Sequence, residues 1–219
     1  MALYLEVPYE QKDHAKLLGA KWDQSRKQWY ATNKFEYYKF LDWIPWSDSN
    51  FSLICDSLYI VEAPHKCFKC KKETNVISLA YNEQFMFYKD VDGNLINYEY
   101  TNNCLHYFTV EDEIDNVQLR SFLKDKFNYY YSYSKTIKEH YVANHCKHCG
   151  KIQGNFHLHE EIHSPFGEYP ECTKDYKLYK IPLAEDSVGF PDYTYSCFSP
   201  DEDMDIITIY SIVIKTIEI

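Results

Sequence analysis

Short alternating runs of apolar and polar residues open the chain and predict a small mixed module. The alternation of Leu3 to Val7 predicts a strand that Pro8 ends. The pattern from Glu10 to Leu18 predicts a helix with Ala15 and Leu18 inward, and Gly19 suits the left-handed residue that follows a helix. These signals favour a strand followed by a helix at the N-terminus.

The following residues complete this module. Trp22 and Trp29 flank a polar turn, which predicts two short strands. Asn33, with Glu36 three positions later, is typical of a helix N-cap, and Pro45 ends the helix that it begins. We therefore expect a β-α-β-β-α module over residues 1–46, which we call the head.

The remaining chain, residues 47–219, has weaker periodic signals that predict mostly strands. Asp92-Gly93 lies between the aromatic-rich runs Gln84 to Lys89 and Leu95 to Tyr100, which predicts a hairpin. Residues 111–127 have a helical pattern, and the Ile-, Thr- and Val-rich residues 205–217 predict a terminal strand that completes a sheet begun elsewhere. The expected fold class is α+β, with the head followed by a β-rich second domain that ends in an acidic strand region.

Composition places the chain among ordinary globular proteins. Of its 219 residues, 45% are hydrophobic and 26% are charged, which excludes disordered, collagen-like and coiled-coil chains. The apolar runs are far too short to span a bilayer, and the first residues do not resemble a secretion signal. We expect a cytoplasmic protein without a membrane partner.

Charge is distributed unevenly along the chain, whose net charge is −10. Residues 12–39 contain seven basic and three acidic residues, whereas residues 166–219 contain eleven acidic and four basic ones. An acidic protein repels phosphates unless its basic residues share one face. The head is therefore the favoured place for nucleic-acid binding.

Four of the eight cysteines form two Cys-x-x-Cys pairs, Cys67 with Cys70 and Cys146 with Cys149. Such pairs supply thiolates to one tetrahedral ion, and four thiolates suit zinc best. We expect one structural Zn²⁺ in a zinc ribbon, with residues 71–145, a hairpin and a helix, as an insertion between the pairs. Gly150 permits the tight turn after Cys149. Iron, a redox dithiol or unrelated thiols remain alternatives, and the isolated cysteines are Cys55, Cys104, Cys172 and Cys197.

Histidines and lysines near the cysteines allow other interpretations. His65, His145 or His148 could replace one cysteine as a ligand. His157 and His159, placed on one side of a predicted strand, could belong to a second metal site, but spacing fixes no third ligand, and a polar strand face or support for the zinc ribbon also explains them. The surrounding lysines would offset the charge of a tetrathiolate or form a phosphate-binding patch; they are Lys66, Lys69, Lys71, Lys72, Lys147 and Lys151.

The head carries a candidate interface for single-stranded nucleic acid. Aromatic rings stack on bases, and basic side chains of the adjoining turn meet phosphates. The candidate residues are Lys21, Trp22, Arg26, Lys27, Trp29 and Tyr30. In the alternative interpretation both tryptophans form the core, because so small a module needs its large aromatics inside.

Two resemblances extend this interpretation. The series Val7-Pro8-Tyr9, Leu18-Gly19-Ala20-Lys21-Trp22-Asp23 and Lys27-x-Trp29-Tyr30 within residues 3–31 resembles a bacterial domain-of-unknown-function family, number 5710. Its members look like accessory modules of plasmid primases and other mobile-element proteins, which implies a context of nucleic-acid metabolism. Residues 64–166, with His145-Cys146-x-x-Cys149-Gly150-x-x-Gln153-Gly154-Asn155-Phe156, resemble an uncharacterised bacterial zinc-ribbon family. Neither resemblance supplies catalytic residues.

Two classes of function follow. The chain contains no glycine-rich phosphate loop, nucleophile elbow or His-Glu-x-x-His motif, so we expect no catalytic residues, although a site assembled only in space leaves no such signal. We favour a non-catalytic, zinc-stabilised adaptor whose head contacts single-stranded nucleic acid in a mobile-element or DNA-metabolism context. The alternative is an acidic interaction or inhibitor protein, of a counter-defence or immunity type, that binds a protein partner and no nucleic acid.

Overall fold

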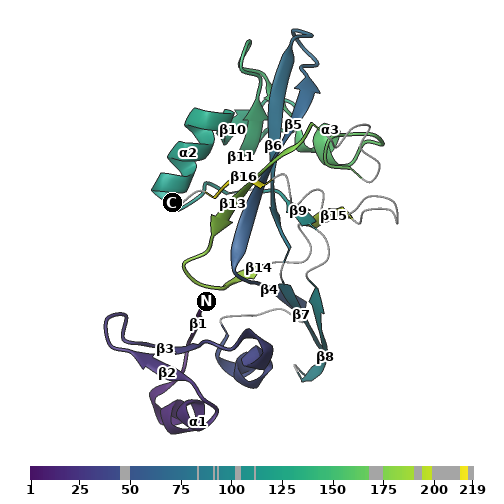
Figure 1. Cartoon of the computed structure of the whole chain (residues 1–219). Coiled ribbons are helices and arrows are strands. Elements are labelled where there is room, and N and C mark those ends of the chain that lie inside the picture. Colours follow the sequence, from purple (N-terminus) through teal and green to yellow (C-terminus); the bar gives the residue numbers. More distant parts are fainter. Residues whose placement is uncertain are drawn as a thin grey trace. The chain divides into compact units, whose positions relative to one another are not determined.

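The chain folds into two units that are interleaved along the sequence. The computed structural model describes residues 1–44, 50–82, 84–90, 92, 94–101, 105–110, 112–167, 175–189, 194–198 and 213–216. Unit 1 comprises residues 1–57, 82–102 and 182–192, and unit 2 comprises residues 58–81, 103–181 and 193–219 (Figure 1). Strands dominate and helices are few, so the predicted α+β class is confirmed.

The head forms a three-stranded antiparallel sheet in the order β1-β3-β2, with helical segments beside it. Its elements are β1 (Leu3–Leu5), the 3₁₀ turn η1 (Tyr9–Gln11), α1 (Lys12–Leu17), β2 (Lys21–Asp23), β3 (Gln28–Ala31) and the 3₁₀ helix η2 (Lys34–Trp43). Gly19 follows α1 with φ +104°, and the Asn33 side chain accepts a hydrogen bond from Phe35 N–H, as the cap signals predict. The β-α-β-β-α order is confirmed, with the last helix of 3₁₀ type.

A four-stranded antiparallel sheet completes unit 1. Its order is β14 (Ser187–Gly189), β4 (Asn50–Ile54), β7 (Gln84–Lys89) and β8 (Leu95–Thr101). The predicted hairpin is confirmed as β7 and β8. The Asp90 carboxylate accepts hydrogen bonds from the backbone N–H groups of Asp92 and Asn94, which fixes the turn.

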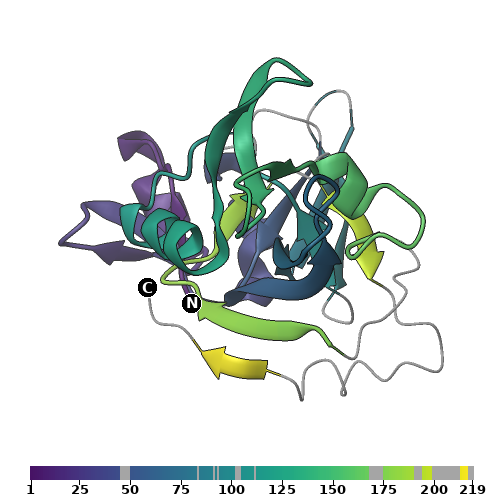
Figure 2. The same ribbon diagram turned by 90° about the horizontal axis from the view of Figure 1, so that it is seen from above.

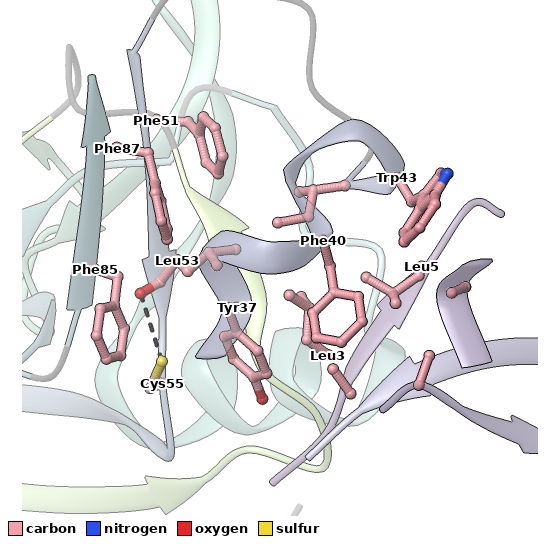
Figure 3. Packing of buried hydrophobic residues seen from close by; sticks show 14 residues of the cluster. Leu3, Leu5, Tyr37, Phe40, Trp43, Phe51, Leu53, Cys55, Phe85 and Phe87 are labelled. Carbon is pink, nitrogen blue, oxygen red and sulfur yellow. Dashed lines mark hydrogen bonds between the residues drawn. The ribbon is translucent and has the colours of Figure 1, made fainter. Parts of the chain in front are cut away.

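The core of unit 1 joins the head to this second sheet (Figure 3). Leu5 of β1 and Phe40 of η2 belong to the same buried cluster as Phe51 of β4 and Phe87 of β7. The compact unit therefore extends beyond the predicted boundary between residues 46 and 47. A module of this size has too little interior to bury its large aromatic side chains alone.

Unit 2 is built around a six-stranded sheet in the order β15-β9-β6-β5-β13-β16. Its strands are β5 (Ser57–Lys66), β6 (Glu73–Tyr81), β9 (Leu105–Phe108), β13 (Lys177–Pro182), β15 (Thr194–Phe198) and β16 (Val213–Thr216). β16 lies parallel to β13 (Figure 2). The predicted terminal strand is thus present within residues 213–216; residues 205–212 and 217 lie outside the described residues.

Both faces of this sheet are covered. Tyr59, Val61 and Ala63 of β5 pack in one cluster with Leu158 and Phe166, which belong to α3 (Asn155–His159) and the segment after it. Ile60 points to the other face, where it packs with residues from α2 (Val117–Phe127), β10 (Tyr129–Ser134) and β11 (Glu139–His145). A third sheet has the order β10-β11-β12, where β12 is Ile152–Gln153.

Three local predictions differ from the structure. The helix predicted over residues 111–127 begins at Val117, after the cap residue Asn116. Residues 71–145, predicted as an insertion, supply β6 and β9 to the central sheet of unit 2 and β7 and β8 to unit 1. His157 and His159, predicted on a strand, lie on helix α3. Within the described part of the chain, no helix has the length and apolar character needed to cross a membrane.

Candidate metal centre and candidate nucleic-acid interface

The two Cys-x-x-Cys pairs occupy equivalent turns at strand ends of unit 2. The first turn follows β5, and the second joins β11 to β12. In the first, Cys67 N–H donates to Lys72 O and Lys71 N–H donates to Cys67 O; in the second, Cys146 N–H donates to Lys151 O and Gly150 N–H donates to Cys146 O. The matching bonds show that both turns are the same structure, which we call the cysteine knuckle.

Each knuckle needs a left-handed residue directly after its second cysteine. Gly150 has φ +66°, as the sequence predicts, and Lys71 occupies the equivalent position with φ +61°. A lysine there is strained relative to glycine. The two knuckles therefore share this left-handed position, although only the second has glycine there.

The four cysteine sulfurs lie within 4.8 Å of one another and could bind one metal ion. The Sγ atoms of Cys67 and Cys149 are 3.7 Å apart, as are those of Cys70 and Cys146. A tetrahedron with metal–sulfur bonds of about 2.3 Å has sulfur–sulfur edges of about 3.8 Å. The observed spacing therefore fits a tetrahedral tetrathiolate centre.

Electrostatics at the cluster also fit a cation. Burial disfavours the Cys67 thiolate, but the N–H groups of Cys70 and Lys69 lower its pKa to about 6. Lys151 N–H favours the Cys149 thiolate, yet burial and the three neighbouring thiols raise its pKa to about 11. Four thiolates cannot share this space without a positive charge between them.

Polar groups of the second knuckle and of β12, which follows it, support the sulfurs and join the two turns. Gln153 Nε2 lies 3.5 Å from Cys67 Sγ, and His148 N–H lies 3.4 Å from Cys146 Sγ. A ring nitrogen of His148 forms a hydrogen bond of 2.9 Å with the backbone oxygen of Glu73, which lies just after the first knuckle. The sequence prediction did not include Gln153 as a supporting residue.

The histidines proposed as alternative ligands lie outside the cysteine group, and His65 is among the residues that line a large groove of unit 2. His145 stacks on Tyr130 and bonds Ser132 Oγ, and His148 bonds the backbone of Glu73. His157 is exposed and pairs with Glu161, whereas His159 is buried beside Tyr107 and Phe166. Among the described residues, only the four cysteines form a group of potential metal ligands. Cys104 and Cys172 lie outside the described residues, and Cys55 is buried in unit 1.

The head contains a pocket of about 670 Å³ between the β2–β3 hairpin and the segment from β1 to α1. Trp22, Trp29 and Lys27 line it, together with Tyr9 and Lys12, which the sequence analysis did not single out. Trp22 is 45% exposed, and its ring lies 5.5 Å from that of Trp29 in an edge-on arrangement. Trp29 is partly buried against the core, so the two tryptophans differ in accessibility.

The pocket combines aromatic faces with positive charge. Tyr9 is 76% exposed, and Lys12 Nζ lies 3.6 Å from the centroid of its ring. Two lysines, Lys12 and Lys27, line the pocket against one carboxylate, Glu6. The sequence alone could not assign Lys12 to this pocket, because Lys12 lines it only through the position of α1 in the fold.

Three of the six predicted residues lie elsewhere. Lys21 pairs with Tyr30 across the β2–β3 hairpin, next to the Trp22–Trp29 pair. Because side chains alternate along a strand, Lys21 and Tyr30 lie on the face of the sheet opposite to the two tryptophans. The Arg26 guanidinium lies 4.2 Å from the Tyr4 ring centroid and pairs with Glu185. Hydrogen bonds from Ser25, Arg26 N–H and Tyr4 OH hold the pKa of Asp23 well below its usual range and order this turn.

The comparisons with known proteins concern the head alone. Residues 2–45 match a family described as Domain of unknown function (DUF5710). Over 40 residues the chain is 42% identical to DNA primase TraC of Escherichia coli, a match that spans 18% of this chain and 3% of that protein. No solved structure matches the chain. The resemblance of residues 3–31 is thereby confirmed, and that of residues 64–166 to a zinc-ribbon family stays a prediction.

Proposed function

We propose that this chain is a non-catalytic binding protein in which one zinc ion stabilises unit 2 and the head pocket takes single-stranded nucleic acid. The zinc assignment rests on four sulfurs at tetrahedral spacing, supported by N–H groups, with no position left for substrate. Such a closed centre holds the fold together and leaves the binding role to another surface. Iron in the same four-thiolate set is the competing assignment.

The head pocket is the binding surface that we favour for a nucleic acid. The observation that carries this proposal is an exposed indole and an exposed phenol beside two lysines in one concave site. A base stacks on such rings, worth roughly 1 to 3 kcal/mol per base, while lysines meet the neighbouring phosphates. The relative with the similar head is a DNA primase, which supports a role in DNA metabolism of a mobile element.

Fluorescence anisotropy with a labelled single-stranded oligonucleotide tests the proposal. We expect saturable binding by the zinc-loaded protein that weakens as salt rises, because phosphate contacts release counterions. Trp22→Ala should weaken binding about fivefold or more, in line with the loss of one stacked base. Lys27→Ala should weaken binding and lower its salt dependence.

Lys21→Ala is the matched control, since it removes the same charge from the opposite face of the same hairpin. It should leave affinity nearly unchanged. Circular dichroism establishes that each variant is folded. Equal losses for Lys21→Ala and Lys27→Ala, or no binding at low salt, would exclude the pocket as the interface.

A further inference from the structure

Unit 2 contains a second, larger cavity whose chemistry differs from that of the head pocket. It is a groove of about 1130 Å³ lined by α3 and the residues after it, by the β10–β11 hairpin, by β12, by the first cysteine knuckle, and by Thr109, Val110 and Asp112. All of these segments belong to unit 2, and Figure 1 shows the elements that carry them. We call it the acidic groove for the reason given next.

Carboxylates predominate along this groove. Among the described residues, Asp112, Glu139, Glu160 and Glu161 line it, against one lysine, Lys66. Glu161 pairs with His157, but within the described part of the chain Glu139 and Glu160 have no ion-pair partner. Lys135 and Lys138 lie on the same hairpin without lining the groove. The groove therefore attracts cations and repels phosphates.

Large apolar side chains lie exposed between these carboxylates. Phe156 of α3 is 55% exposed, Ile137 of the hairpin is 53% exposed, and Tyr131 of β10 also faces solvent. Aromatic faces bind the cationic heads of lysine and arginine, and exposed aromatics are enriched at protein interfaces. The same groove thus offers sites for basic and for apolar side chains of one ligand.

We propose that the acidic groove binds a segment of a protein partner in which lysine or arginine side chains alternate with apolar ones. Charge complementarity selects this occupant. A nucleic acid has the wrong sign, and so does the stretch Asp201-Glu202-Asp203 of the chain itself. The groove and the head pocket share no lining residue, so binding to each can be tested separately.

Selection from a library of short random peptides tests this proposal on the intact zinc-loaded protein. We expect the selected peptides to be enriched in arginine and lysine beside aromatic or aliphatic residues. The double variant Glu139→Gln with Glu160→Gln should weaken their binding about fivefold to tenfold at low salt, as expected for the loss of two exposed ion pairs. Phe156→Ala should weaken binding at every salt concentration.

The matched control is Asp115→Asn with Asp125→Asn, which removes the same charge from exposed positions of unit 2 outside the groove. It should bind the peptides as the unchanged protein does. The proposal is overturned if the selected peptides are not enriched in basic residues, or if the two double variants lose peptide affinity equally. It is also overturned if a second copy of the chain occupies the groove, which would appear in sedimentation as a dimer that the Glu139/Glu160 variant abolishes.

Discussion

Single side chains in unit 2 show how burial controls titration. His159 lies on α3, is 5% exposed and packs beside the rings of Tyr107 and Phe166. Burial lowers its pKa to about 4, because the charged imidazolium would lose its hydration. His157, two residues earlier on the same helix, is exposed and pairs with Glu161. Two neighbouring histidines therefore have opposite environments.

This contrast predicts a specific acid sensitivity. The folded pKa of His159 lies below its unfolded value near 6.5, so the unfolded chain binds more protons between these values. The stabilisation is complete above about pH 6.5 and is lost as pH falls towards 4, by roughly 3 kcal/mol in total. Urea unfolding across this pH range measures the effect. The free energy of unfolding should fall less steeply with decreasing pH in His159→Phe than in the unchanged protein.

The control for the acid prediction is His157→Phe, the same substitution at the exposed position. It should retain the pH dependence of the unchanged protein. If His159→Phe loses as much stability on acidification as the unchanged protein, other buried groups, such as His145 with its lowered pKa, account for the whole effect.

At the scale of elements, helix η2 is tied to the return segment, residues 182–189 of unit 1. Tyr37 OH donates to Asp186 Oδ2 at 2.6 Å, and Asp56 N–H donates to Asp186 Oδ1 at 2.9 Å. Burial raises the pKa of Asp186, and both donors favour its charged form. Tyr37 is fully buried and Asp186 nearly so. A buried carboxylate depends on such donors for its stability.

Tyr37→Phe should therefore destabilise the protein by about 1 to 3 kcal/mol, because it leaves the buried carboxylate short of one donor. Urea unfolding of the zinc-loaded protein measures the change. Tyr38→Phe, at the next and more exposed position of η2, is the control and should change stability by no more than about 0.5 kcal/mol. Equal effects of the two substitutions would contradict this role of the Tyr37 hydroxyl.

At the scale of the whole molecule, the cysteine cluster joins segments that are 75 residues apart in the chain. A metal ion bound by the four cysteines would close a loop that contains strands of both units. Structural zinc contributes roughly 10 to 16 kcal/mol in zinc-finger peptides, so its removal here should affect a large part of unit 2. Trp22, Trp29 and Trp43 all lie in unit 1, so their fluorescence reports the unfolding of that unit separately.

We expect one zinc ion per chain by elemental analysis, and its loss in Cys70→Ser and Cys149→Ser. Chelation should lower the melting temperature and speed hydrogen exchange at residues 67–72 and 146–151. Cobalt substitution should give the absorption bands of a tetrahedral thiolate site. Visible absorption of iron–thiolate bonds in the purified protein, with no zinc present, would replace zinc by iron in this assignment.

The sequence by itself determined the features that depend on neighbouring residues. Gly19 and Asn33 specify helix ends through local backbone geometry, and Asp92-Gly93 specifies the β7–β8 hairpin. The two Cys-x-x-Cys spacings indicated the cysteine cluster, because each pair fixes its own knuckle without help from the rest of the fold. Local chemistry was sufficient at these positions.

Only the tertiary structure decided which distant residues share a surface. β5 and β6 are buried on both faces, so they lack the alternation by which a strand is found in sequence. The six residues predicted as an interface at the head do not share one surface, because strand pairing places Trp22 and Lys21 on opposite faces of the sheet. Tyr9 and Lys12, from a different part of the head, line the pocket instead. Glu139 and Glu160 line one groove for the same reason: pairing and packing join segments whose spacing along the chain carries no such information.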